Sequence, residues 1–522
     1  DIIQSLKDTT YSQAQITSIE EYFINILGNR GYAFAEVAGN PEIDEETNEV
    51  KLIFSVQPGN RTYTRKILFT GNDITQDHVL RREMRQFEGA WTSDNAIEAG
   101  KVRLERLGYF KEVNVETIPV PGTDDQIDIS YSVEEETTGS IGGNIGYSDF
   151  GLMLGFNLQE QNFLGSGNTV GIGINKNVYS EMYNISYMNP YATRDGVSLG
   201  YNLYFRETDY GEFNVANYLT NSSGFGAQFG YPISDITRLG FNITYDKTDI
   251  DIGSLPAREI YDFVSVEGNI FETLSAQLSW QRVTLNRGLF PTDGASTVLS
   301  VSSTIPGSDL SYYRLNVRQR YYQPLTQNLV FGFQGELGYL DAYGDTEETP
   351  FFQNFYAGGP RSLRGFESNT LGPRSTDAPC YEFNYAEGTC PNLLDTDGDG
   401  ELDTPYYNPY ANQTSRYRDA PIGGNIKIEG SLQLIFRLPF IEDQRSLRSA
   451  FFFDFGNVFS DNCKDYQINC SEPSVDDLRY SYGIGLTWIT GFGPMSLAIA
   501  KPTNAGPRER TEEFQFTVGN VF

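Results

Sequence analysis

An acidic loop near residue 400 has the spacing of a cation site. Oxygen-bearing side chains recur at alternating positions around a glycine that permits a sharp turn, as in loops that bind hard cations such as Ca2+. The aspartates are Asp395, Asp397, Asp399 and Asp403. Tyr406 stands where an EF-hand would place its last carboxylate. Two interpretations therefore stay open, a calcium site and a solvated acidic turn.

The four cysteines form two close pairs in polar, turn-rich segments. Cys380 is near Cys390, and Cys463 is near Cys470. In an oxidising compartment, two local disulfides are the simplest interpretation. Zinc is disfavoured because the spacings are long and the single histidine, His78, is far away in sequence.

The sequence offers no catalytic constellation. One histidine excludes a His-pair zinc hydrolase, and no phosphate-binding loop or serine elbow occurs. A net charge of -31 without a basic stripe argues against a nucleic-acid partner. We therefore predict a protein that is not an enzyme, has no catalytic residues and requires no cofactor.

A glycine-rich run in a long polar segment, 344–421, contains an unusual arginine. The run 358–366 reads GGPRSLRGF, which by itself indicates a tight turn. If this loop folds inward, the guanidinium of Arg364 needs carboxylate partners. Asp454 interrupts a very apolar strand and could be one, although a water-facing position explains it equally well.

The elements that would position these residues are strands. From Gly139 onward apolar and polar residues alternate with period two, as in Leu329, Phe331 and Phe333, and we expect no helix in this region. The final stretch alternates in the same way and stops on Phe522. The expected strands lie near 140–148, 151–160, 168–177, 181–190, 195–206, 222–231, 237–248, 273–286, 294–304, 311–324, 327–343, 422–438, 447–459, 478–490, 493–501 and 513–522. The fold class is a transmembrane antiparallel β-barrel of sixteen strands, residues 139–522, with N-terminal α+β modules.

Connection lengths indicate the kind of membrane. Every second connection is short, as at 161–167 and 323–327, and the long segments 249–272 and 344–421 belong to the other set. Short turns on one rim and long loops on the other are typical of outer-membrane barrels. We expect the short turns and the N-terminal modules on the periplasmic side, and both cysteine pairs on the outside.

Residues 1–136 contain a tandem repeat. A helical pattern followed by a Gly-Tyr step and two strand-like runs occurs twice, with the steps at Tyr32 and Tyr109. Residues 61–136 form a complete module. Residues 1–60 lack its opening strand, so we expect a truncated module there and further copies upstream.

Several long motifs occur together in a familiar order. They are RREMRQ at 81–86 with EGAW at 88–91, NFLGSG at 162–167, GLFPTDG at 288–294, LRGF at 363–366 and the ending FQFTVGNVF. The chain resembles the BamA family, the central subunits of the bacterial outer-membrane β-barrel assembly machinery. The resemblance implies two POTRA modules and a sixteen-stranded barrel in a Gram-negative outer membrane, with the modules in the periplasm. It also implies accessory lipoproteins, unfolded outer-membrane protein clients, periplasmic chaperones and the lipid bilayer as partners.

The resemblance also implies a clamp between the long loop and the barrel wall. Arg364, with Gly365 and Phe366, would meet Asp454. Where the family has a second carboxylate this chain has Gln433, and Glu429 lies on the same strand face as a candidate substitute.

The first and last strands should form the weakest seam of the barrel. Glycine weakens a strand and loosens its register, and the first strand carries Gly139, Gly142, Gly143 and Gly146 beside Ile141. Its partner is the short last strand with Phe516, Val518 and Phe522. We expect client strands to add to this edge, and a crosslink between positions 141 and 518 to block insertion. A two-partner secretion transporter and a passive porin or surface adhesin stay as alternatives.

Overall fold

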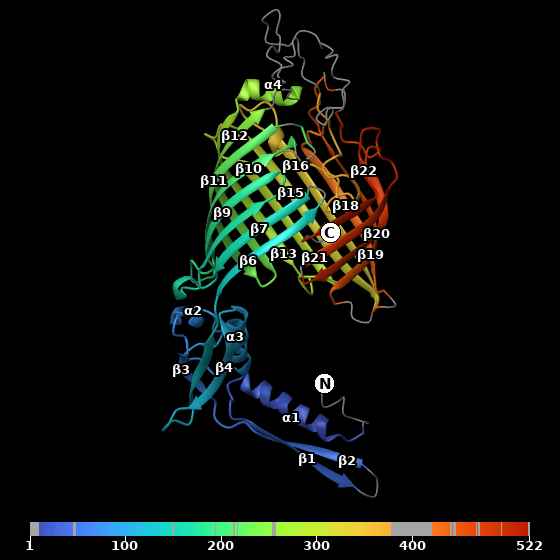
Figure 1. Cartoon of the computed structure of the whole chain (residues 1–522). Coiled ribbons are helices and arrows are strands. Elements are labelled where there is room, and N and C mark those ends of the chain that lie inside the picture. Colours follow the sequence, from blue (N-terminus) through green and yellow to red (C-terminus); the bar gives the residue numbers. More distant parts are fainter. Residues whose placement is uncertain are drawn as a thin grey trace, which may run out of the picture. The chain divides into compact units, whose positions relative to one another are not determined.

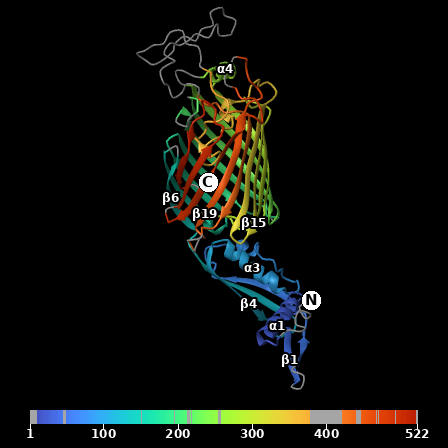
Figure 2. The ribbon, with the colours of Figure 1, turned by 90° about the vertical axis from the view of Figure 1, so that its right-hand side faces the viewer.

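The structure is a computed structural model and comprises two compact units (Figures 1 and 2). One unit is Asp1–Ser140 with Glu160–Thr169, and the other is Ile141–Gln159 with Val170–Phe522. The described residues are 10–44, 49–148, 151–193, 195–211, 215–216, 218–252, 257–376, 420–438, 441, 445–465, 467, 470–491 and 493–519.

The first N-terminal module is a helix and a two-stranded sheet. Helix α1 spans Gln13–Gly28, and strands β1 (Glu36–Asp44) and β2 (Glu49–Gln57) pair antiparallel. Ile16 and Ile19, three positions apart and so on one helical face, are buried. The predicted helix and strands of this module are confirmed.

The second module is a three-stranded sheet with two helices. Its elements are β3 (Tyr63–Thr70), α2 (Asp77–Arg81), α3 (Asp94–Arg106), β4 (Phe110–Pro119) and β5 (Gln126–Glu135). The sheet order is β3-β5-β4, with β3 parallel and β4 antiparallel to β5. The side chain of Ser93 caps α3 by accepting a hydrogen bond from the amide of Ala96. Leu80, Leu104 and Tyr131 are among the residues of its core.

Sixteen antiparallel strands close the barrel, which confirms the predicted fold class. Most observed bounds agree with the expected ones within a few residues, because the period-two pattern runs through each strand. The strands are β6 (Gly139–Ser148), β7 (Gly151–Glu160), β8 (Thr169–Lys176), β9 (Ser180–Asn189), β10 (Ser198–Asp209), β11 (Tyr218–Ser234), β12 (Thr237–Ile252), β13 (Ile270–Val283), β14 (Gly294–Thr304), β15 (Tyr312–Thr326), β16 (Leu329–Ala342), β18 (Ile426–Phe436), β19 (Leu447–Phe459), β20 (Arg479–Thr490), β21 (Gly493–Pro502) and β23 (Phe514–Val518).

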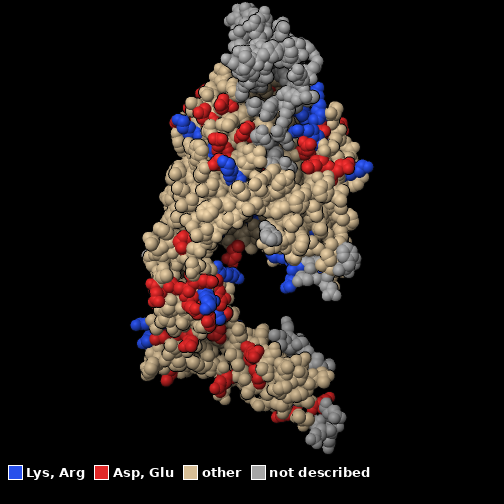
Figure 3. Space-filling view, viewed as in Figure 1, with Lys and Arg blue, Asp and Glu red and all other residues tan. Residues whose placement is uncertain are grey.

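The outer face of the barrel is apolar. Along β7, Leu152, Leu154 and Phe156 are exposed and each is separated from the next by one residue, so they point to the same side. Figure 3 shows a broad band of the barrel surface that is almost without charged side chains. Among the described helices, none is long and apolar enough to cross a membrane.

One expectation about this region is wrong, because the connection between β12 and β13 contains a helix. Helix α4 spans Arg258–Glu267, and its Ile260 and Phe263 are buried against Tyr218 and Phe351. The helix is short and its apolar residues include aromatic and β-branched types, which also suit strands. Tertiary burial at one end of the barrel decides its conformation.

Candidate functional site

The arginine of the glycine-rich run is bound to the barrel wall by a bidentate ion pair. The Nε and Nη2 atoms of Arg364 donate to the two carboxylate oxygens of Asp454, each at 2.7 Å. The backbone amide of Arg364 also donates to Asp454, at 3.2 Å. The side chains are 7% and 0% exposed, respectively. Such burial is tolerated only when the geometry is good and further hydrogen bonds form, as they do here.

The guanidinium of Arg364 also contacts neutral groups. Nη2 donates to the hydroxyl of Ser431 at 3.0 Å, and Cζ lies 3.5 Å from the ring centroid of Phe452. Stacking on an aromatic ring suits the flat, weakly hydrated guanidinium. Ser431 and Phe452 flank Asp454 on β18 and β19, so the loop is held by two adjacent strands.

Glu429, the candidate for the second carboxylate, contacts the loop, but its described contacts do not include the arginine. Glu429 accepts a hydrogen bond from the hydroxyl of Ser362 and pairs with Lys427 at 3.0 Å. The side-chain nitrogen of Gln433 donates to the hydroxyl of Ser431 at 3.3 Å. Glu429 therefore binds the same loop two residues before Arg364, and a serine takes the second position beside the guanidinium. The strand face that carries Glu429 was predicted correctly. Which loop residue Glu429 contacts depends on the conformation of the loop inside the barrel.

An apolar cluster seats the loop next to the ion pair. Leu363 and Phe366, on either side of Arg364 and Gly365, are both 0% exposed and pack with Leu371 and Val458. Gly365 has φ +91°, and a Cβ there would lie 3.1 Å from the side chain of Ala500. The positive φ strains any other residue at this position, and the tight contact with Ala500 also favours glycine.

The loop is also tied to the last strand. Gly365–Phe366, strand β17, pairs with Thr511–Glu512, strand β22, just before β23. The side chain of Gln515 on β23 accepts from the amide of Gly365 at 3.3 Å and donates to the carbonyl of Phe366 at 2.8 Å. The loop thus connects the wall at β18 and β19 with the closing strand of the barrel.

The closure between the first and last strands rests on few contacts in the part of the chain that the structure describes. Among the described residues, β23 and β6 share one residue pair, Val518 with Tyr147. On its other side β23 pairs with β21 continuously, from Met495↔Val518 to Ile499↔Phe514. The predicted strands therefore meet at the closure, and the weakness of the seam stays a prediction.

The register of the seam differs from the expected one. Val518 faces Tyr147, and Ile141 lies about 20 Å away along the strand, so a crosslink between positions 141 and 518 is ruled out. Gly146 lies at the seam, where an added Cβ would be 2.9 Å from the carbonyl oxygen of Val518. Gly142 and Gly143 lie farther along β6, where an added Cβ would meet open space at Gly142 and only an ordinary contact, 3.9 Å from the carbonyl oxygen of Gly155, at Gly143. Gly139 is at the start of the strand, and Phe522 lies outside the described residues.

Several contributing residues were not singled out from the sequence. Gln515 and Ser431 are ordinary polar residues in strands with alternating polarity. The alternation indicates that they face inward, but it does not indicate a contact with the loop. Gly519 follows β23 with φ +84°, and its amide donates to the carbonyl of Pro494 at 2.7 Å. This turns the backbone at the seam, a feature that alternation alone does not reveal.

The other candidate residues are in the long loops. Cys463 and Cys470 form a disulfide, as predicted, with Cα atoms 5.8 Å apart. Cys380, Cys390 and the acidic run with Asp395, Asp397, Asp399 and Asp403 lie outside the described residues. Their pairing and their cation remain predictions.

A closed sixteen-stranded barrel with an apolar outer face, an inward-folded loop and N-terminal α+β modules defines an outer-membrane barrel protein. Comparison with known proteins specifies the class further. The Omp85 superfamily domain matches residues 162–522, and the POTRA family, described as surface antigen variable number repeat, matches residues 1–59 and 62–136.

Relatives and solved structures agree with these matches. Outer membrane protein assembly factor BamA from Neisseria meningitidis serogroup B is 29% identical, over 98% of this chain and 63% of that protein. The crystal structure of BamA from Haemophilus ducreyi lacking POTRA domains 1-3 aligns with TM-score 0.80 and 32% identity, over 98% of this chain and 94% of that one. CdiB from Escherichia coli aligns with TM-score 0.54 at 12% identity, which is a likeness of fold.

The chain belongs to the Omp85 superfamily and, within it, to the BamA family. It is an outer-membrane protein with POTRA modules. It spans 63% of the length of the Neisseria relative.

Proposed function

We propose that this chain folds outer-membrane proteins and inserts them into the membrane through the seam between β6 and β23. The observation that carries the proposal is the single pair, Val518↔Tyr147, that joins these strands in the described residues. Few hydrogen bonds hold such a closure, so local opening costs little free energy.

An opened seam exposes a strand edge in the membrane. The unpaired amides and carbonyls of β6 can then pair with a strand of an incoming client, which adds to the sheet. Each added strand satisfies backbone groups that lipid cannot. The free energy comes from the client's own folding, so neither a nucleotide nor another cofactor is required and no bond is broken in catalysis.

The clamp between the long loop and the barrel wall holds one of the two strands of the seam, β23, in place. Arg364 and Asp454 hold the long loop on β18 and β19, and Gln515 connects the loop to β23. The last strand therefore keeps its place while β6 moves. We further propose that the POTRA modules lie in the periplasm, bind accessory lipoproteins and receive unfolded clients from chaperones.

A crosslink across the seam tests the proposal. The experiment uses Tyr147→Cys with Val518→Cys, in a background with Cys380→Ser and Cys390→Ser, reconstituted in liposomes with an unfolded barrel protein as client. The control is Met495→Cys with Val518→Cys, which joins the last strand to its other neighbour and leaves the seam free. Paired residues on antiparallel strands have Cα separations that suit a disulfide.

We expect oxidation to stop client folding in the seam variant and to leave the control active. Equal folding by oxidised seam and control variants would contradict insertion through this seam. Export of a substrate through the pore, without accelerated client folding, would instead favour a two-partner secretion transporter.

A further inference from the structure

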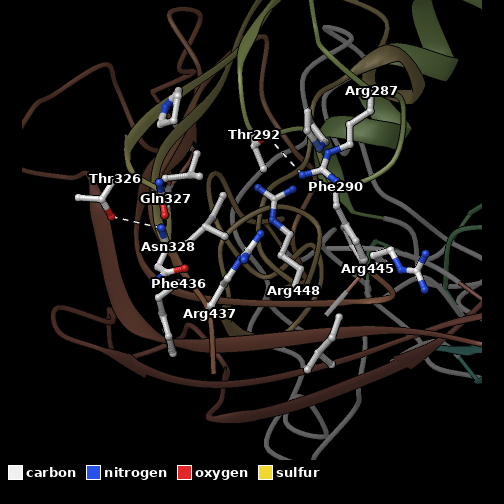
Figure 4. Close-up of a pocket in the computed structure, with 15 residues that line it drawn as sticks. Arg287, Phe290, Thr292, Thr326, Gln327, Asn328, Phe436, Arg437, Arg445 and Arg448 are labelled. Carbon is white, nitrogen blue, oxygen red and sulfur yellow. Dashed lines mark hydrogen bonds between the residues drawn. The ribbon is translucent and has the colours of Figure 1, made fainter. Parts of the chain in front are cut away.

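A cavity of about 690 Å³ lies at the short-turn end of the barrel. It is lined by the connection between β13 and β14, which contains Phe290 and Pro291, and by residues of β15, β16, β18 and β19 or the turns next to them, such as Val330 and Ile435 (Figure 4). Its volume is in the range of small-molecule sites. None of the clamp or seam residues lines it.

Arginines gather in this cavity. Figure 4 shows the guanidinium groups of Arg287, Arg437 and Arg448 pointing toward one another, whereas Arg445 points away from them. Of the described residues that line the cavity, none is acidic. In a chain of net charge -31 this is an unusual local excess of positive charge.

One of these guanidinium groups lacks a hydrogen-bond partner at a buried nitrogen. Nη2 of Arg448 is buried without a partner in the described part of the chain, although its Cζ lies 4.9 Å from the ring centroid of Tyr322. Arg287 donates to a neutral group, the hydroxyl of Thr292, at 3.3 Å. A buried cationic donor without an acceptor is costly, and an anion in the cavity would satisfy it.

The cavity wall is built to keep its shape. The side-chain oxygen of Asn286 accepts from the amides of Thr292 and Asp293, at 3.1 and 3.4 Å, and so closes the β13–β14 turn on itself. Phe290 and Pro291 are buried and give the cavity an apolar side. The site thus combines donors for an anion with apolar surface for an attached carbon chain.

We propose that this cavity binds a phosphate group, supplied by the headgroup of an anionic phospholipid. Planar guanidinium groups match phosphate oxygens in pairs, and several of them together suit its charge better than they suit a single carboxylate. The apolar side favours a lipid over inorganic phosphate. Glu442 and Asp443, in the β18–β19 turn, lie outside the described residues. The proposal is independent of client insertion.

Binding is measured by calorimetry on the full chain in a phosphate-free maltoside detergent. The probes are inorganic phosphate, dihexanoylphosphatidylglycerol and, as a phosphate-free amphiphile, dihexanoylglycerol. The variants are Arg437→Gln with Arg448→Gln, and Arg437→Lys with Arg448→Lys, which keeps the charge but not the forked donors. The control is Arg238→Gln, which removes a positive charge near the start of β12, outside the cavity lining. Heat-dependent gel mobility confirms that each barrel is folded.

We expect saturable binding of phosphatidylglycerol, weakened at least about tenfold by the glutamine pair, less by the lysine pair and not by Arg238→Gln. Phosphate binding as tight as lipid binding would support the site but make free phosphate the ligand. The proposal is overturned if neither phosphate probe binds, if dihexanoylglycerol binds equally well, or if Arg238→Gln weakens binding as much as the glutamine pair. Should the glutamine pair fail to fold, unchanged affinity in the lysine pair would overturn it.

Discussion

Two parts of one barrel wall are joined in very different ways. β18 pairs with β19 along the whole length of β18, from Ile426↔Phe459 to Phe436↔Ser449, and an inward-folded loop is bound across them by a buried ion pair. β23 and β6 share one pair within the described residues. Hydrogen-bonded length and buried contacts set the free energy of local opening, so the first region should stay closed under conditions that open the second.

The two regions are nevertheless connected through the loop. The residue next to Arg364, Gly365, is bound by Gln515 on β23. The strong region therefore supports one side of the weak one, while β6 has no such support in the described structure. Opening should accordingly be one-sided, with β6 moving and β23 staying near the clamp.

The largest effect is expected from Asp454→Ala, which removes the ion pair that binds the loop to β18 and β19. Arg364 would be left as a buried, uncompensated charge, which costs about 3–5 kcal/mol. Urea unfolding of the barrel, followed by gel mobility, measures it. Asp246→Ala is the control, because Asp246 on the lumen side accepts from Tyr204 without an ion pair among the described residues, and it should cost about 1 kcal/mol. Equal costs would mean that the clamp does not brace the barrel.

Gln515→Ala should remove the link between the two regions. The amide of Gly365 and the carbonyl of Phe366 would lose their buried partner, at a cost of about 1–3 kcal/mol. The rate of disulfide formation across the seam, in a protein that also carries Tyr147→Cys and Val518→Cys, reports seam closure, and we expect this rate to fall. An unchanged rate would show that the loop does not position the last strand.

Replacing two glycines of β6 should shift the weak region in opposite directions. Gly142→Val meets open space. Because glycine loses more conformational freedom than other residues on folding, the change should stabilise the strand by about 0.5–1 kcal/mol and slow insertion a few-fold. Gly146→Val meets the carbonyl oxygen of Val518 and should hold the seam open. Client folding rates and seam crosslinking measure both. Equal behaviour of the two variants would contradict the observed register.

The smallest effect is expected from acid, on the stability of the second module where its residue Thr75 contacts the turn that joins β7 and β8. Burial alone would raise the pKa of Glu135, but hydrogen bonds from Thr75 and from the amide of Ile74 hold that pKa below its usual value. The contribution of Glu135 to stability is therefore present above the unfolded pKa of about 4.3 and is lost as pH falls through the lower folded pKa. Thr75 in turn accepts from Asn162 in the β7–β8 turn, at 2.8 Å.

Unfolding of the modules between about pH 5 and 2, compared with Glu135→Gln, checks this expectation. The variant should lose part of the acid dependence. An identical pH profile would assign the dependence to other carboxylates.

The sequence by itself determined the barrel, its strand number and the tandem modules. Period-two alternation is a local property, because each lipid-facing residue must be apolar wherever the strand lies. The same reasoning located the disulfide of Cys463 and Cys470, which are neighbours in the chain. Glycines on the first strand and a short last strand also predicted a weak closure between these two strands.

Only the tertiary structure decided which residues meet across the barrel. Ser431 rather than Glu429 joins Asp454 at the guanidinium, and Val518 faces Tyr147 rather than Ile141. Helix α4 and the link from Gln515 to Gly365 were likewise not evident from the sequence. These contacts join residues far apart in the chain, and their register depends on closure of the whole sheet and on the seating of a long loop, which no local pattern records.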